Sequence, residues 1–167
     1  ASAYAAIATA YVTACALRWV EPREGFRAAR RYADRAVELD GTIVEAHVAL
    51  ALIAGEYDWD WQAAEASYAR ALELGPGSAW AHRSFARFLA TQGRFEESLA
   101  ATRRALELDP TSALMAQGAA QRFYDARQYD RAVAMARFAV RLDPINPYSY
   151  PTLGFALLEQ GAYDDAI

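Results

Sequence analysis

The sequence predicts an all-α protein built from a repeated pair of antiparallel helices, on three observations. The phrase RALELDP at 104–110 recurs in close variants at 70–76 and 138–144, shifted by 34 positions each time, and at 35–41, shifted by 35. Aromatic residues keep the same period at Trp61, Phe95, Tyr129 and Tyr163, and Phe26 lies 35 positions before Trp61. Apolar residues in 95–108 follow helical spacing until Pro110, which lacks an amide hydrogen, ends the pattern. Two independent markers of one period indicate an internal repeat.

The first repeat is expected to contain helices at 2–17 and 24–39. This repeat, about 1–43, is some nine residues longer than the 34-residue period; the extra length is placed at 18–25, where Pro22 and Gly25 favour a loop. The second repeat is expected to contain helices at 43–57 and 61–74. Thr42 and Glu45 have the spacing of a capping box at its start. The turn 57–61 carries one extra residue, and Asp60 can cap the following helix.

The remaining repeats follow the same plan. The third is expected at 79–92 and 95–108, with Ser78 as cap and Gly93 in the turn, and the fourth at 112–126 and 129–142. Two nearby prolines delay the fifth, whose helix is expected from about Ser149 to Gln160, with 163–167 opening a truncated second helix. The chain is therefore one domain, 1–167, with repeats at about 1–43, 44–78, 79–112, 113–146 and 147–167. Because it starts without Met and stops five residues into a helix, we expect a fragment of a longer protein.

Composition narrows the function. The 167 residues carry a net charge of −4, and we found no cluster among the 17 basic residues, all arginine, so nucleic acid is not expected as the main partner. The apolar first 17 residues fit the first repeat and predict neither a signal peptide nor a membrane span. Cys15 is the only cysteine, is expected in the core and cannot form an intramolecular disulfide. A cytoplasmic location is expected, and a periplasmic one stays open.

The 34-residue pattern resembles the tetratricopeptide repeat (TPR) family. That family places an aromatic residue, then Leu-Gly, then Tyr on the first helix, with small alanines and a late proline on the second. The fifth repeat matches it at Tyr150, Leu153, Gly154, Leu157, Gly161, Tyr163 and Ala166. The resemblance implies a right-handed α-solenoid, the TPR superhelix, of about 4.5 repeats. It also implies that the aromatic opening each second helix fills the wedge between hairpins, so that Trp61 lies in the core.

Two unusual phrases sharpen this resemblance. One is Pro22-Arg23-Glu24 followed by RAVELDGT and Glu45-Ala46-His47, and the other is YDWDW at 57–61 followed by AAE. Together they are similar to repeat arrays attached to bacterial transcription factors of the winged-helix class, nucleotide cyclases or protein kinases. The resemblance implies a module of a bacterial signalling or transcription-regulatory protein.

No residue pattern indicates catalysis. His47 and His82 occupy equivalent repeat positions, and two histidines without a further ligand favour packing over a metal site. Trp59 belongs to the extra residue and is expected to pack, although it could be exposed. There is no phosphate loop, CxxC or HExxH, so we expect no enzyme activity, no cofactor and no metal. Arginines on the second helices are expected to form a solvated face with Glu partners; these are Arg30, Arg31, Arg35, Arg103, Arg104 and Arg137.

The expected function is a protein–protein interaction scaffold that binds a peptide or helix in the concave groove formed by the first helices. The groove positions implied by the resemblance are, in the second repeat, Glu45, Val48 and Leu52; in the third, Trp80, Arg83, Arg87 and Thr91; and in the fourth, Leu114, Gln117, Gln121, Tyr124 and Asp125. The candidate site within them consists of Trp80, Arg83, Arg87, Gln117, Gln121 and Tyr124. Arginine suits carboxylates, so an acidic peptide is expected. Ala5 and Thr9 stand where chaperone-binding members have Lys and Asn, which disfavours a co-chaperone.

The alternative is a structural or oligomerisation element that positions effector domains without a groove ligand. The fifth repeat supports this alternative, because its second helix is incomplete and leaves one face of its first helix uncovered. The open face is expected to include Tyr148, Leu153, Phe155, Ala156, Leu157 and Leu158. Self-association through this C-terminal end is therefore expected of the isolated chain.

Overall fold

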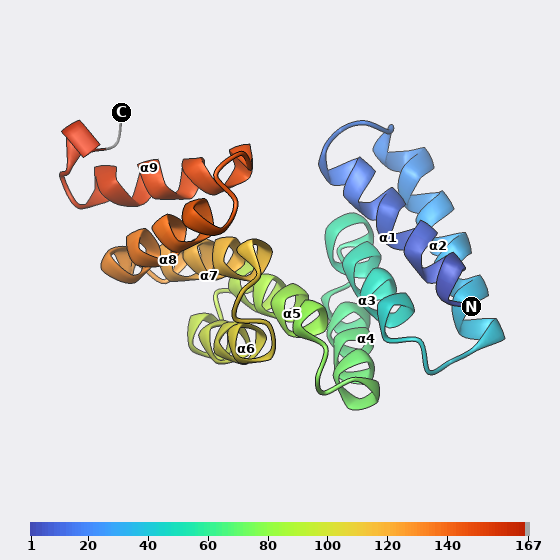
Figure 1. Ribbon diagram of the computed structural model, residues 1–167. Helices are drawn as coiled ribbons and strands as arrows, with labels where there is room; N and C mark the ends of the chain where they lie inside the picture. Colours follow the sequence, from blue (N-terminus) through green and yellow to red (C-terminus); the bar gives the residue numbers. More distant parts are fainter. Residues whose placement is uncertain (166–167) are drawn as a thin grey trace. The chain divides into compact units, whose positions relative to one another are not determined.

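The computed structural model describes residues 1–165, which form nine α-helices and no strand (Figure 1). The elements are α1 (Ser2–Ala16), α2 (Pro22–Leu39), α3 (Val44–Ile53), the π-helical turn η1 (Ala54–Asp58), α4 (Trp61–Leu74), α5 (Ala79–Thr91), α6 (Phe95–Leu108), α7 (Ala113–Asp125), α8 (Tyr129–Leu142), the 3-10 turn η2 (Pro147–Ser149), α9 (Tyr150–Glu159) and the 3-10 turn η3 (Tyr163–Asp165). The all-α prediction is confirmed. The chain divides into two compact units, Ala1–Ala81 and His82–Ile167, and α5 begins in the first and continues in the second.

Alanine layers hold the first unit together. Ala5, Ala36 and Ala46, one from each of α1, α2 and α3, form one buried cluster. Three residues further along α1 and α3, Ala8 and Ala49 form a second cluster with an alanine of α2. Side chains of one carbon let three helices approach closely, and a spacing of three keeps each pair on one helix face. These buried alanines therefore serve packing between the helices, which is the role expected of small residues in a helix-pair repeat.

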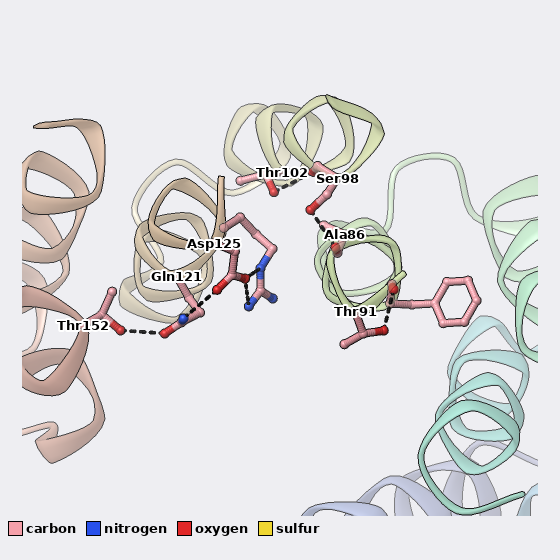
Figure 2. Close-up of polar contacts among 9 residues, drawn as sticks. Ala86, Thr91, Ser98, Thr102, Gln121, Asp125 and Thr152 are labelled. Atoms are coloured by element: carbon pink, nitrogen blue, oxygen red, sulfur yellow. Dashed lines mark hydrogen bonds and ion pairs between the residues drawn. The ribbon is translucent and has the colours of Figure 1, made fainter. Parts of the chain in front are cut away.

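Larger side chains build the core of the second unit. Leu99 of α6, Phe123 of α7, Val133 of α8 and Leu157 of α9 belong to one continuous buried cluster. A buried hydroxyl ladder joins the first two helices of this unit, since Ser98 Oγ donates to the carbonyl oxygen of Ala86 at 2.7 Å (Figure 2). Four successive helices thus share one core, which explains why a single hairpin would not be stable alone.

Two of the predicted helix caps are confirmed, and a third is wrong. Asp60 and Ser78 accept backbone hydrogen bonds at the starts of α4 and α5, as predicted. The predicted Thr42 capping box is wrong, because the Asp40 carboxylate accepts both the amide and the hydroxyl hydrogen of Thr42, and α3 has no side-chain cap. The loop predicted around Pro22 and Gly25 is also wrong. Pro22 occupies the first position of α2, where its missing amide costs nothing, and the preceding glutamate caps the helix.

The turns inside the repeats share one backbone conformation. Positive φ angles occur at Trp59, Gly93, Arg127 and Gly161, which are spaced 34 apart, and also at Arg18. In the third repeat, the amide of residue 94 donates to the carbonyl oxygen of residue 89 across Gly93, which is the Schellman pattern of a helix end. The extra residue of the second repeat was predicted in the turn after position 57. It lies instead within the first helix, where the π-helical turn Ala54–Asp58 absorbs it.

The aromatic residues that open the second helices are not uniformly buried, contrary to the wedge prediction. Phe26 is buried, but Trp61 is 37% exposed, Phe95 is 39% exposed and Tyr163 is 64% exposed. Each lies at or near the start of its helix, at the tip of a hairpin, where one side of the ring remains open. Trp59, 70% exposed, meets Trp61 edge to face at 5.4 Å, so Trp61 packs against a surface residue rather than lying in the core.

The C-terminal repeat differs from its prediction in two ways. Ala156 and Leu157 are buried against α7 and α8, so only part of the predicted open face is exposed. The expected second helix at 163–167 begins as a 3-10 turn at Tyr163–Asp165, and residues 166 and 167 lie outside the described part. Of the residues predicted on the open face, Tyr148, Phe155 and Leu158 are exposed and Leu153 is half-buried.

Candidate partner-binding site

The candidate site is built on first helices of successive repeats in the second unit. Arg83 and Arg87 lie four residues apart on α5, and Gln117 and Gln121 lie four apart on α7, so each pair shares a helix face. Tyr124 lies one turn further along α7. The sixth predicted residue, Trp80, lies in the first turn of α5 and belongs to the first unit, so the site described here consists of the other five.

A glycine shapes the contact between α5 and α7. The Arg83 side chain crosses α7 at Gly118, and its Nε donates to the carbonyl oxygen of Leu114 at 3.2 Å. A Cβ atom at position 118 would lie 2.9 Å from that Nε and 3.4 Å from Cδ and Cγ. Gly118 therefore leaves the space in which the arginine stem lies. The sequence analysis did not identify this glycine, because nothing in the repeat pattern pairs it with Arg83.

The two glutamines are already engaged by the following repeat. Gln117 Nε2 donates to the carbonyl oxygen of Tyr148 at 2.9 Å, and Gln121 Oε1 accepts from the Thr152 hydroxyl at 2.9 Å. Gln121 Nε2 donates in turn to Asp125 Oδ1 at 2.9 Å (Figure 2). Their amides hold α7 against the segment that starts α9. Because they already have partners, the glutamines form the support of the site more than its contact surface.

A third arginine, which the sequence analysis missed, completes the cationic group. Arg122 binds Asp125 through Nε at 2.9 Å, and its side chain is only 11% exposed. Burial lowers the pKa of Arg83 to about 10, and the positive charge of Arg122 contributes to the lowering. The same two causes lower the pKa of Arg87. Arg83 and Arg87 therefore both feel the positive charge of Arg122, which is itself paired with Asp125.

Access to this group is from the surface. The space enclosed between Arg83 and Arg122 under Gly118 has a volume of about 10 Å³, enough for about one water molecule. Beside the group, the half-buried Tyr124 ring lies 5.7 Å from Tyr129 and 6.4 Å from Phe155. A ligand of peptide size can therefore contact Arg83, Arg87 and Tyr124 only through the partly exposed surface of these side chains.

Two of the groove positions expected in the second repeat are not open to a partner, whereas other groove positions are exposed. Val48 and Leu52 are buried, so their prediction as groove residues is wrong. Apolar side chains there contribute to the core instead. Glu45 and Thr91 are exposed, and the Thr91 hydroxyl donates back to the carbonyl oxygen of Phe88. Leu114 is 40% exposed, and its backbone contributes the acceptor for Arg83.

The cysteine and the histidine His47, considered above as candidates for reactivity or metal binding, contact other parts of the chain. Cys15 is buried, and burial raises the pKa of its thiol, with a smaller contribution from the Glu21 carboxylate. His47 Nε2 lies 3.0 Å from the carbonyl oxygen of Gly41. Within residues 1–165, no three His, Cys, Asp or Glu side chains gather closely enough to hold a metal ion. Over the same stretch, every helix is too short or too polar to cross a membrane.

Comparison with known proteins agrees with the helix pairs. Two tetratricopeptide repeat family models match residues 58–121 and 118–167. No curated protein matches at a significant level. Among solved structures, TTC0263, a thermophilic TPR protein of Thermus thermophilus, has a TM-score of 0.75 at 17% identity, covering 95% of this chain and 86% of that one. The structure described for PilF of Pseudomonas aeruginosa has a TM-score of 0.73 at 20% identity, covering 98% and 73%.

A third solved structure is that of YrrB, described as a TPR protein with an unusual peptide-binding site. It has a TM-score of 0.63 at 16% identity and covers 94% of this chain and 79% of its own. At these identities the likeness shows the fold. With the matched models and the 34-residue helix pairs, it follows that this chain belongs to the tetratricopeptide repeat family.

Proposed function

We propose that this protein–protein interaction module binds an acidic peptide along the face of α5 and α7 that carries Arg83, Arg87 and Tyr124. The observation that carries the proposal is the gathering of three arginines, since Arg83 and Arg87 lie on one face of α5 and the charge of Arg122 acts on both. Asp125 already pairs with Arg122, so a ligand carboxylate would bind beside Arg83 and Arg87, where the planar guanidinium can hold it with two hydrogen bonds.

The neighbouring residues indicate which side chains the proposed peptide would carry beside its carboxylates. Tyr124 offers a partly exposed aromatic face for an apolar side chain next to the charged group. Gln117 and Gln121 hold α7 and the start of α9 in register, so the surface is preformed. The peptide-binding site named for YrrB supports a peptide ligand, because it belongs to a protein of the same fold.

We further propose that the module acts within a bacterial signalling or transcription-regulatory protein, in a binding role without catalysis. The support is the pair of phrases at 22–24 and 57–61, which are similar to repeat arrays attached to such regulators. The YDWDW phrase has a structural counterpart in the π-helical turn and the exposed Trp59. Identifying the domains encoded beside this array, followed by partner capture with the intact protein, tests that setting.

Substituting Gly118 tests the peptide site without touching a charge. The new Cβ of Gly118→Ala would displace the Arg83 stem, so we expect affinity for an acidic peptide to fall about tenfold. Alanine is favoured over glycine in a helix by about 1 kcal/mol, so the free energy of unfolding should fall little or rise. A fluorescein-labelled Asp/Glu peptide, with prolines that prevent helix formation, serves as probe in anisotropy titrations.

The matched control is a double-mutant cycle with Arg83→Ala. If Gly118→Ala acts by moving Arg83, it should cost nothing more once Arg83 is removed. Full affinity in both single variants would contradict the proposed site. If a peptide with Gln and Asn in place of Glu and Asp binds the wild type with the same affinity, the proposed preference for an acidic ligand is contradicted.

The alternative function, assembly of the chain with itself, is favoured by the C-terminal end. Phe155 is 56% exposed, Tyr148 55% and Leu158 45%, and all three lie in the segment Pro147–Glu159. An apolar surface of this kind gains free energy when a second copy covers it. The self-association expected from the sequence is therefore proposed through these residues instead of through Leu157.

Sedimentation velocity of the chain checks this alternative. We expect the average mass to rise with concentration in the micromolar range, and the rise to disappear in Phe155→Ser/Leu158→Ser. Exposed side chains lose little stability on this change, so the variant should stay folded. The control is Leu114→Ser, which removes a similarly exposed leucine from α7. A wild type that stays monomeric at high micromolar concentration would exclude self-association through this end.

A further inference from the structure

The solvent face of α2 carries a row of arginines that the peptide site does not use. Arg23, Arg27, Arg31 and Arg35 follow one another at intervals of four residues, and all four are exposed. Residues four apart lie on one helix face, so the row extends for roughly 18 Å along the helix. The sequence predicted Arg31 and Arg35 on a solvated face, but the row that they form with Arg23 and Arg27 was not recognised.

Helix stability does not account for the row. Like charges four apart repel each other and weaken a helix. Arg35 binds Glu38 at 2.9 Å, and the Arg31 guanidinium lies 5.3 Å from the centre of the Tyr32 ring. Arg23 and Arg27 form no ion pair with any residue between 1 and 165. The face therefore carries positive charges that the chain itself leaves largely unbalanced.

A hollow with aromatic walls adjoins this row. Its volume is about 580 Å³, and Arg27, Arg31 and Arg35 form part of its lining. Tyr57, from the π-helical turn, stacks on Phe26 of α2 at 4.9 Å and closes one side. The next residue of the turn, Asp58, forms an ion pair with Arg30 and anchors the turn on α2. The inserted residue of the second repeat thus helps to build a wall of the hollow.

A second stack closes the other side. Tyr4 of α1 lies 6.1 Å from the ring of Tyr32, which also stacks on Tyr11 at 5.8 Å. Tyr4 is 37% exposed and lines the hollow. The face therefore combines a cationic row with partly exposed aromatic rings, two features that suit different side chains of one partner segment.

We propose that this face of α2 docks an acidic α-helix of a protein partner, with carboxylates at every fourth position beside a row of apolar side chains. Carboxylates at that spacing rise about 6 Å per step, which matches the rise between the arginines. Each guanidinium fork can bind a carboxylate with two hydrogen bonds. The apolar side chains of the partner would enter the hollow between the Phe26–Tyr57 stack and Tyr4.

The charge balance favours a protein helix over nucleic acid. Helix α2 carries five arginines against three acidic residues, Glu24, Asp34 and Glu38, and the whole chain has a net charge of −4. A nucleic acid presents a phosphate about every 1.7 Å of duplex and would meet those carboxylates as well. A helix that places a few carboxylates at fixed intervals can pair with the arginines alone.

The test uses the full chain and a fluorescein-labelled helical peptide of Ala and Leu with four Glu residues spaced four apart. We expect anisotropy titrations at about 0.15 M salt, where the Debye length is about 8 Å, to show binding. Arg27→Gln/Arg31→Gln should weaken it about tenfold, as expected from losing two exposed charged contacts. Arg103→Gln/Arg104→Gln removes two exposed arginines from α6 and should leave the affinity unchanged.

Thermal melts followed by circular dichroism show whether both variants are folded, and relief of repulsion should keep the α2 variant at least as stable as the wild type. The proposal is overturned if a peptide with Gln in place of Glu binds equally well, if the helical probe does not bind, or if the two double variants lose affinity alike. Tighter binding of a DNA duplex of equal charge would also overturn it in favour of nucleic acid.

Discussion

The substitution Gly25→Ala is expected to lower the free energy of unfolding by about 2 kcal/mol, because it forces a methyl group into an occupied space. A Cβ atom at Gly25 would lie 2.2 Å from Cys15 Sγ and 3.2 Å from Val20 Cγ1. Both neighbours belong to α1 and its connection to α2, so relieving the clash would separate the first two helices. The gain in helix propensity from alanine, at most about 1 kcal/mol, offsets part of the cost.

The clash arises mainly from one atom, Cys15 Sγ, so a second substitution can test it directly. Removing the sulfur with Cys15→Ala takes away the 2.2 Å contact, and the next contact is 3.2 Å. Cys15→Ala/Gly25→Ala should therefore be more stable than the sum of the two single changes indicates, by about 1 kcal/mol or more. Urea unfolding followed by circular dichroism measures the four proteins of this cycle.

Gly77→Ala is the matched control, since nothing lies within 4 Å of a Cβ atom built at Gly77. We expect its stability to stay within about 0.5 kcal/mol of the wild type, or to rise because the unfolded chain loses freedom. If Gly25→Ala behaves like Gly77→Ala, the Cys15 thiol turns away without cost, and α1 and α2 do not require a glycine at their crossing.

The repeat pattern predicted most accurately the helices whose first and last residues are marked by characteristic residue types. For α4, α6 and α8 the predicted and observed bounds coincide, because an aromatic residue opens each helix and a Gly-Pro or Asp-Pro pair follows its end. Counting residues also revealed the extra residue of the second repeat. It could not locate that residue, because a π-helical turn and a longer loop add the same number of positions to the period.

Caps and groove residues were harder to predict, since they depend on competition between neighbours. Thr42 had the spacing of a capping residue, but the Asp40 carboxylate lies closer in sequence and takes its hydroxyl. Val48 and Leu52 occupy positions that face the groove in a repeat template, yet both are buried. Periodicity assigns a residue to a helix face, whereas neighbouring side chains decide whether that face is open.

The candidate site was predicted only in part for the same reason. The spacing of four residues predicted that Arg83 shares a helix face with Arg87, and Gln117 with Gln121. In the structure, each pair lies within one helix, α5 or α7. The sequence did not indicate that Gln117 already binds the backbone of the next repeat. Arg122 could have been found from its spacing of three to Asp125, which is typical of a helical ion pair.

Reversing the charge of both α5 arginines is expected to abolish binding of the acidic peptide. In Arg83→Glu/Arg87→Glu, two attractive contacts become repulsive, and a charged hydrogen bond contributes about 1.5–3 kcal/mol, so we expect a loss of about 100-fold or more. Anisotropy titrations with the proline-containing Asp/Glu peptide measure it. Arg103→Glu/Arg104→Glu, which reverses two exposed charges on α6, should bind nearly as the wild type does.

Stability should survive the reversal, and the pKa of Arg83 gives the reason. The pKa of Arg83 in the folded chain, about 10, lies below its value in the unfolded chain, so the unfolded chain holds the proton more tightly. Between those two pH values the free energy of unfolding rises with pH, and at neutral pH the charge of Arg83 opposes folding. A glutamate near Arg122 replaces that repulsion, the smaller cause, by attraction, whereas the cost of burying a charge remains and the bond to Leu114 is lost. The melting temperature should therefore stay within a few degrees. An unchanged peptide affinity in the folded variant would show that the peptide does not bind at Arg83 and Arg87.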